Sequence, residues 1–132
     1  MLDLQSFRWL GGERVWMGLA LDQGQLEVVI GGNENRMDEL RLALAGEVVD
    51  DAATVERLGS EYLDSFVDRA KFSAGGKWSL SSLEFGRQES DQFNEFTAYF
   101  MLDDDVYGLW SVQFRQQERF GISPFQFSRQ QN

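Results

Sequence analysis

The spacing of apolar residues changes twice along this chain of 132 residues, and the change restricts the folds that it can adopt. Apolar residues in 15–30 recur with a period of two, which is typical of strands. Between residues 35 and 70 they recur every three to four positions, as on one face of a helix. The period of two returns at Trp78. The sequence therefore predicts strands, then two helices, then strands again.

Capping residues predict where the helices begin and end. Asn35 is expected to cap the first helix, which we expect to stop near Gly46. Asp50 or Asp51 is expected to cap the second helix, which runs to about Ala70. Its apolar stripe is predicted to consist of Val55, Leu58, Tyr62, Phe66 and Ala70.

Glycine-rich turns separate the predicted strands. The first block of strands covers Phe7–Ile30, and later strands are predicted over Trp78–Phe85, Phe93–Leu102 and Val106–Phe114. Phe96, Ala98, Phe100 and Leu102 are predicted to share one face, and Val106 to share a face with Trp110. The phenylalanine-rich tail is expected to pack as a last short strand or a crossing segment.

Grouped helices between hairpin-linked strands favour an α+β fold. We expect one antiparallel sheet, with the two-helix hairpin inserted between the strand blocks and packed on one face. The length corresponds to a single domain, residues 1–132. A content of 42% hydrophobic residues is sufficient for one core without metals or crosslinks.

The chain contains neither cysteine nor histidine. The first absence excludes disulfides and thiolate metal sites, and the second excludes imidazole ligands and histidine-dependent nucleophiles. We therefore predict no catalytic residue, no metal ligand and no cofactor, and expect the protein not to be an enzyme. The start of the chain shows no signal-peptide pattern, and no apolar stretch is long enough to span a bilayer, so we expect a cytoplasmic protein.

The formal net charge is −10, which disfavours binding to nucleic acid or to an anionic membrane and favours a basic protein partner. The charge is also unevenly distributed. Residues 34–68 hold ten acids and three arginines, and residues 89–105 hold six acids and no base. In contrast, residues 106–132 carry a net charge of +2.

Six acidic residues are predicted to bind the partner. Glu61, Asp64 and Asp68 are spaced by three and four residues, which places them together opposite the apolar stripe of the second helix. Like charges at this spacing reduce helix stability. Two explanations for the acidic row remain open: a docking face for a cationic partner, or a surface that serves only solubility. Asp103, Asp104 and Asp105 form an acidic turn between two strands and complete the predicted surface.

Two other classes of function remain open. One is a small-molecule or metal-binding module with a pocket lined by Trp and Tyr, although the aspartate runs lack the calcium-loop spacing. The other is a carboxylate-based hydrolase, for which Glu84, Glu95 and Asp105 lie on neighbouring predicted strands.

The order of elements and the hairpin Phe96–Val112, with its turn Leu102-Asp103-Asp104-Asp105-Val106-Tyr107-Gly108, resemble small bacterial domains of unknown function found in toxin–immunity gene clusters. The resemblance implies an immunity-type inhibitor that binds and blocks a toxin without chemistry of its own. An acidic inhibitor of a cationic toxin is consistent with the charge pattern.

Overall fold

The computed structural model describes residues 1–21, 24–106, 108–118 and 121–131. Tyr107 of the predicted acidic turn, Asp22 and Gln23 before Gly24, and Phe120 of the phenylalanine-rich tail therefore lie outside the described residues. Four strands come first: β1 (Leu2–Leu10), β2 (Val15–Ala20), β3 (Glu27–Asn33) and β4 (Arg36–Met37). Helices α1 (Glu39–Asp50) and α2 (Ala52–Phe66) follow, and then a single 3-10 turn at Arg69–Lys71. The last four strands are β5 (Trp78–Phe85), β6 (Glu95–Leu102), β7 (Gly108–Gln117) and β8 (Gly121–Gln131).

The strands form one sheet in the order β1-β2-β3-β5-β6-β7-β8, with β4 paired to β3. This confirms the α+β class and the two-helix insertion between strand blocks. Neighbouring strands are antiparallel except β3 and β5, which pair in parallel from Glu27 opposite Ser82 to Ile30 opposite Phe85. A parallel pair needs a long crossover connection, which the two helices provide.

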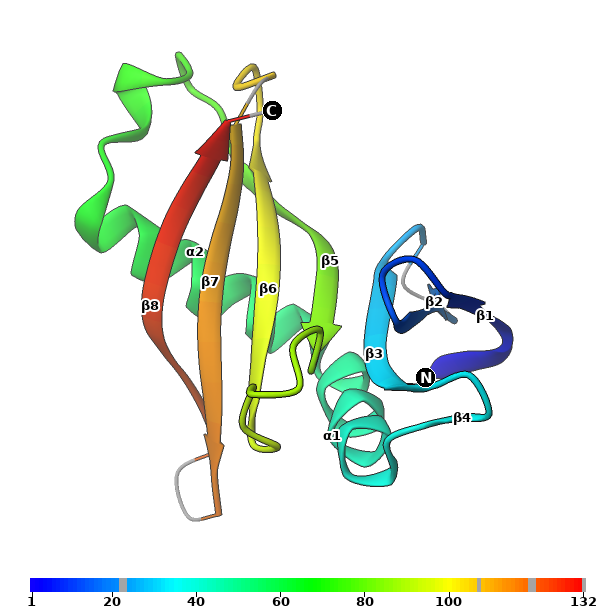
Figure 1. The fold of residues 1–132 in the computed structure, drawn as a ribbon. Helices are drawn as coiled ribbons and strands as arrows, with labels where there is room; N and C mark the ends of the chain where they lie inside the picture. The colour runs from blue at the N-terminus through cyan, green and yellow to red at the C-terminus, as the bar shows by residue number, and fades with distance from the viewer. Residues whose placement is uncertain (22–23, 107, 119–120, 132) are drawn as a thin grey trace.

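The core lies between the sheet and the helices. Figure 1 shows α2 crossing behind β6, β7 and β8. The strands β1, β2 and β3 turn away from these three strands. Helix α1 contacts β1, β3 and β5. The predicted buried face of β6 is confirmed, since Phe96, Ala98, Phe100 and Leu102 are all buried. α2 approaches this face closely at Gly59, where an added Cβ would lie 2.3 Å from the ring of Phe100.

α1 begins and ends later than predicted. It starts after Asp38, because Asn35 belongs to the turn between β3 and β4, where the Asn33 side-chain oxygen accepts two backbone N–H groups. It also continues past Gly46, because the next turn of the helix places Val48 and Val49 in the core. Burial of these two side chains outweighs the modest cost of a glycine within a helix.

α2 starts after Asp51, one of the two predicted caps, but ends at Phe66 and not at Ala70. The chain leaves the helix at Val67, whose backbone is extended. The buried stripe is also rotated from the predicted one. Its buried members are Ala52, Val55, Gly59 and Leu63.

The strand boundaries differ most near the turns. β5 matches its predicted range, whereas β1 begins earlier than Phe7, and β6 and β7 begin two residues later than predicted. Val106 therefore lies outside β7 and is exposed, which contradicts its predicted place on the buried face. The tail forms the long edge strand β8, so the prediction of a last strand is confirmed and only its shortness was wrong.

Candidate functional site

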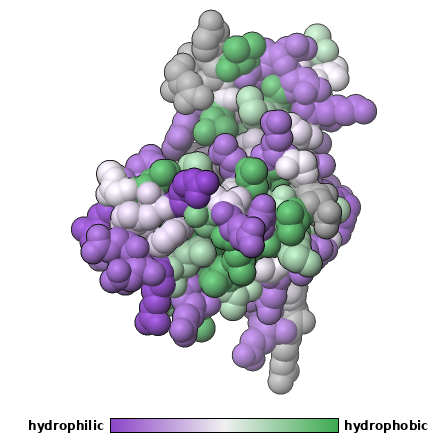
Figure 2. Space-filling model, turned by 90° about the vertical axis from the view of Figure 1, so that its right-hand side faces the viewer, coloured by the Kyte–Doolittle hydropathy of each residue, from purple (hydrophilic) through white to green (hydrophobic). Residues whose placement is uncertain are grey.

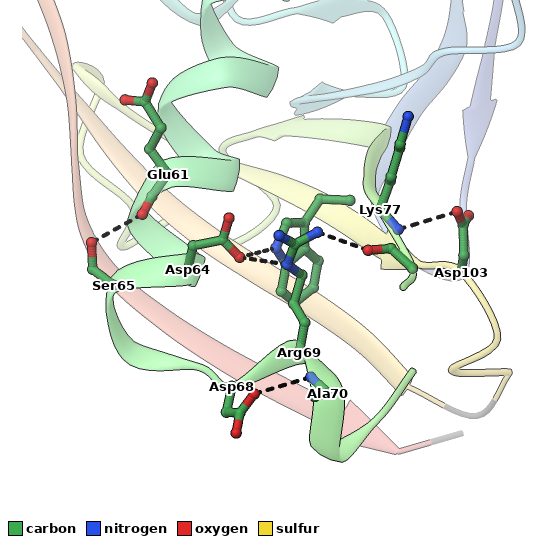
Figure 3. A network of polar contacts seen from close by, with 10 residues as sticks. Glu61, Asp64, Ser65, Asp68, Arg69, Ala70, Lys77 and Asp103 are labelled. Atoms are coloured by element: carbon green, nitrogen blue, oxygen red, sulfur yellow. Dashed lines mark hydrogen bonds and ion pairs between the residues drawn. The ribbon is translucent and has the colours of Figure 1, made fainter. Parts of the chain in front are cut away.

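Hydrogen bonds fix the acidic residue Asp64 near the end of α2. Its Oδ1 accepts from the indole Nε1 of Trp78 at 2.8 Å and pairs with the guanidinium Nε of Arg69 at 2.9 Å. Arg69 also donates from Nη1 to the backbone oxygen of Gly76 at 2.7 Å. These bonds join α2, the 3-10 turn and the start of β5 (Figure 3). Asp64 thus has a structural role, and Arg69 partly compensates its charge.

The predicted acidic row on α2 is broken beyond Asp64. Asp68 lies outside the helix, contrary to prediction, because the chain is extended at Val67. Its Oδ1 instead accepts the backbone N–H of Ala70 at 3.1 Å and caps the 3-10 turn. Glu61 remains on α2, exposed and 3.6 Å from Arg57. In Figure 3 the carboxylates of Glu61 and Asp68 point in different directions from that of Asp64.

A groove of about 680 Å³ nevertheless brings two of the predicted segments together. Asp64, Asp68, Arg69 and Lys77 all line it. Asp103 reaches the same corner, because its Oδ2 accepts the backbone N–H of Lys77 at 3.1 Å. Fold contacts therefore unite residues from α2 and from the turn between β6 and β7. The groove itself has mixed charge, since Arg69 and Lys77 are part of its lining.

The remaining aspartates of that turn separate into one exposed and one buried residue. Asp104 is exposed and has a left-handed φ of 68°. Asp105 is only 8% exposed, and it accepts hydrogen bonds from Arg129 Nη2 at 2.9 Å and from Trp110 Nε1 at 2.8 Å. The bonds from Arg129 and Trp110 lower the pKa of Asp105, although burial opposes them. Asp105 therefore does not lie on the exposed surface where the sequence analysis placed it.

An aromatic cluster that the sequence analysis did not find lies at the end of α2, with one exposed ring and two partly buried ones. Phe66, predicted to be part of the buried stripe, is 62% exposed and stacks on Phe127 of β8 with ring centroids 5.4 Å apart. Tyr62 completes the cluster, at 5.1 Å from Phe66 and 6.1 Å from Phe127. Residue spacing marks these rings as apolar but does not reveal that α2 ends at the edge of the sheet.

Two of the carboxylates considered for hydrolysis, Glu84 and Glu95, line one cavity of about 40 Å³. Each is paired with an arginine at 2.8 Å, Glu84 with Arg87 and Glu95 with Arg115. Tyr99 donates to Glu84 at 3.0 Å, and burial together with the charge of Glu84 raises the pKa of Tyr99 to about 12. This cavity has room for a few water molecules and none for a sugar ring.

The face formed by β1–β4 is mixed in character, because Figure 2 shows apolar side chains there between hydrophilic ones. Among the described residues, no three His, Cys, Asp or Glu side chains converge to hold a metal ion. No helix in the described ranges has the length and apolar character needed to cross a membrane. No family model, curated protein or solved structure matches the chain.

Proposed function

We propose that this protein is a non-catalytic binding protein that docks a basic protein partner. The docking surface consists of Glu61, Tyr62, Phe66, Asp68 and Phe127, and we call it the α2-end surface. The observation that carries the proposal is Phe66, an aromatic ring that is 62% exposed at the end of α2, in the same acidic segment as Glu61 and Asp68. The resemblance to domains of toxin–immunity gene clusters supports a more specific form, in which the partner is a toxin and this chain its inhibitor.

The aromatic cluster has the properties of an interface anchor. Aromatic residues are enriched at protein interfaces, and a few of them, surrounded by a polar rim, commonly contribute most of the binding energy. Covering the exposed part of Phe66 alone contributes about 1–2 kcal/mol of apolar burial. Tyr62 and Phe127 both pack against the ring of Phe66, which restricts it and reduces the conformational entropy that binding removes.

The charges around the cluster favour a cationic partner. Within the described ranges, the side chain of Glu61 has only a loose, exposed ion pair with Arg57, and that of Asp68 bonds only to a backbone N–H group. Both carboxylates lie in the segment 34–68, which has ten acids against three arginines. Attraction of this kind accelerates association and weakens as salt rises, because the Debye length is only about 8 Å at physiological ionic strength.

The test is capture of the partner from an extract of the native cell on the immobilised full chain. We expect the captured protein to be basic and to dissociate as the salt concentration rises. Phe66→Ala removes the anchor, and Glu61→Lys combined with Asp68→Lys reverses the rim charges. Each change is expected to reduce the affinity for the captured protein by about tenfold or more.

Matched control variants lie outside the α2-end surface. Leu40→Ala removes an exposed apolar side chain from α1, and Glu34→Lys reverses an exposed charge in the turn before β4. Both should capture as much partner as the wild type. Undiminished capture by Phe66→Ala and by the double reversal would show that the α2-end surface is not the docking site. Capture that does not respond to salt contradicts the electrostatic part of the proposal.

A further inference from the structure

The first residue of β5, Trp78, contacts α2 through Asp64. At the other end of β5, just after Phe85, lies a larger cleft of about 720 Å³. It opens where β3 and β5, the parallel pair, both end and where α1 begins after Asp38. In open α/β sheets, ligands bind beyond the carboxyl ends of the strands, beside helix N-termini. The volume is also within the range of about 300–1,000 Å³ that is usual for small-molecule sites.

One wall of this cleft contains a buried positive charge. Arg41 is 5% exposed, and its guanidinium bonds to Asp38 Oδ2 at 2.7 Å and to the backbone oxygen of Asp91 at 2.8 Å. Its Nε has no hydrogen-bond partner within the described residues. Gly86 provides the space, because it has a φ of 74° and an added Cβ there would lie 2.1 Å from that Nε. The guanidinium also lies 4.5 Å from the ring centroid of Phe93, which lines the cleft.

Two other lining side chains have opposite charges, and neither forms an ion pair among the described residues. Arg14, in the turn between β1 and β2, has a left-handed φ of 59° and an exposed side chain. Neither its guanidinium nor the carboxylate of Glu89 forms an ion pair with any residue in the described ranges. In contrast, Arg87 in the same lining is 3.6 Å from Glu13. In the part of the chain that the structure describes, the cleft thus presents one cation and one anion without an ion pair, and one exposed aromatic ring.

We propose that this cleft binds a small zwitterion with a flat apolar group, of which an aromatic α-amino acid is the simplest example. The ligand carboxylate pairs with Arg14 through a charge-assisted contact, because the charge of the buried Arg41 is already compensated by Asp38. The ligand ammonium pairs with Glu89, and the flat group packs on Phe93. A ligand with only one charge leaves either Arg14 or Glu89 unpaired. This site is separate from the α2-end surface and does not depend on the proposed partner.

The test is an NMR titration of the ¹⁵N-labelled full chain with L-phenylalanine. The backbone amides of Gly32 and Gly86 report on binding, because both residues line the cleft. We expect their signals to shift until saturation. Two analogues serve as matched ligands, since 3-phenylpropionate lacks the ammonium group and phenethylamine lacks the carboxylate. Each analogue is expected to bind about tenfold more weakly than L-phenylalanine, because it loses one charge-assisted contact.

Variants then assign each charge to its contact. Arg14→Gln is expected to weaken L-phenylalanine and 3-phenylpropionate by about tenfold and to leave phenethylamine unaffected. Glu89→Gln should produce the reverse pattern, whereas Arg8→Gln, the same charge change on β1 outside the cleft, should alter no affinity. The proposal is overturned if L-phenylalanine gives no saturable shift at these glycines. It is equally overturned if all three ligands bind alike, or if the variants affect them alike.

Discussion

Replacing Asp105 by alanine should destabilise the protein, although the residue belongs to an acidic turn. Its carboxylate is the acceptor for the indole N–H of Trp110, which is only 2% exposed and therefore cannot bond to water instead. A buried donor that loses its acceptor costs about 1–3 kcal/mol. For a domain of this length, 1 kcal/mol lowers the Tm by roughly 3–5 °C, so a loss of about 2 kcal/mol lowers it by roughly 6–10 °C.

Urea unfolding followed by tryptophan fluorescence measures this loss as a shift of the midpoint at constant slope. Asp104→Asn is the matched control, because Asp104 is exposed and asparagine tolerates its left-handed backbone. We expect the control to change the free energy of unfolding by less than about 0.5 kcal/mol. If Asp105→Ala is no more destabilising than Asp104→Asn, the buried bond to Trp110 does not stabilise the fold.

Acid should remove the charge-dependent part of this stabilisation. The pKa of Asp105 is lowered in the folded protein, so its ionised form contributes stability that is complete above the ordinary carboxyl pKa of about 4. That contribution decreases as the pH falls below this value and disappears once the pH passes through the lower, folded-state pKa. The difference between wild type and Asp105→Ala should therefore narrow below about pH 4. A difference that stays constant from neutral pH into strong acid contradicts the ion pair with Arg129.

Two further variants test the packing and the sheet network. Gly59→Ala improves intrinsic helix propensity by about 1 kcal/mol, yet it forces a Cβ against Phe100, and we expect a net loss of about 1–2 kcal/mol in urea unfolding. A stabilised Gly59→Ala variant would mean that α2 does not lie this close to β6. Tyr99, with its pKa raised to about 12, should ionise well above the ordinary tyrosine pKa of about 10, so Tyr99→Phe removes a step near pH 12 from a tyrosinate absorbance titration. Because the unfolded chain loses this proton near pH 10, stability should also fall between about pH 10 and 12 in the wild type and less in the variant. If the step that Tyr99→Phe removes lies near pH 10 and not near pH 12, the contact with Glu84 is contradicted.

Much of the fold follows from local pattern. The change from a period of two to a period of three to four and back predicts the number and order of the helices, because each period matches one way of burying a face. β5 has its predicted bounds, although the alternation changes phase between Leu80 and Leu83, where its pairing with β6 is irregular. The ends of α1 and α2 were less predictable. Whether a helix continues past Gly46, or stops before Ala70, depends on which side chains the rest of the molecule can bury.

The candidate site shows the same division. Residue spacing groups Glu61, Asp64 and Asp68, but the structure gives each carboxylate a different environment. Asp64 and Asp105 both accept a tryptophan indole N–H and pair with an arginine, and no local signal in the sequence indicates these contacts. One partner of each aspartate is distant in the sequence, Trp78 for Asp64 and Arg129 for Asp105, and it becomes a neighbour only when the chain has folded.

The sequence by itself determined the α+β class, the two-helix insertion and the concentration of acidic residues in two segments. These properties depend on periodicity and composition, which are local and can be summed along the chain. Only the tertiary structure decided which carboxylates are buried, that Phe66 is exposed at the sheet edge, and that Arg14, Arg41 and Glu89 border one cleft. The reason is physical. Burial and pairing depend on contacts between residues far apart in the chain, and these contacts exist only after the strands have joined in one particular order.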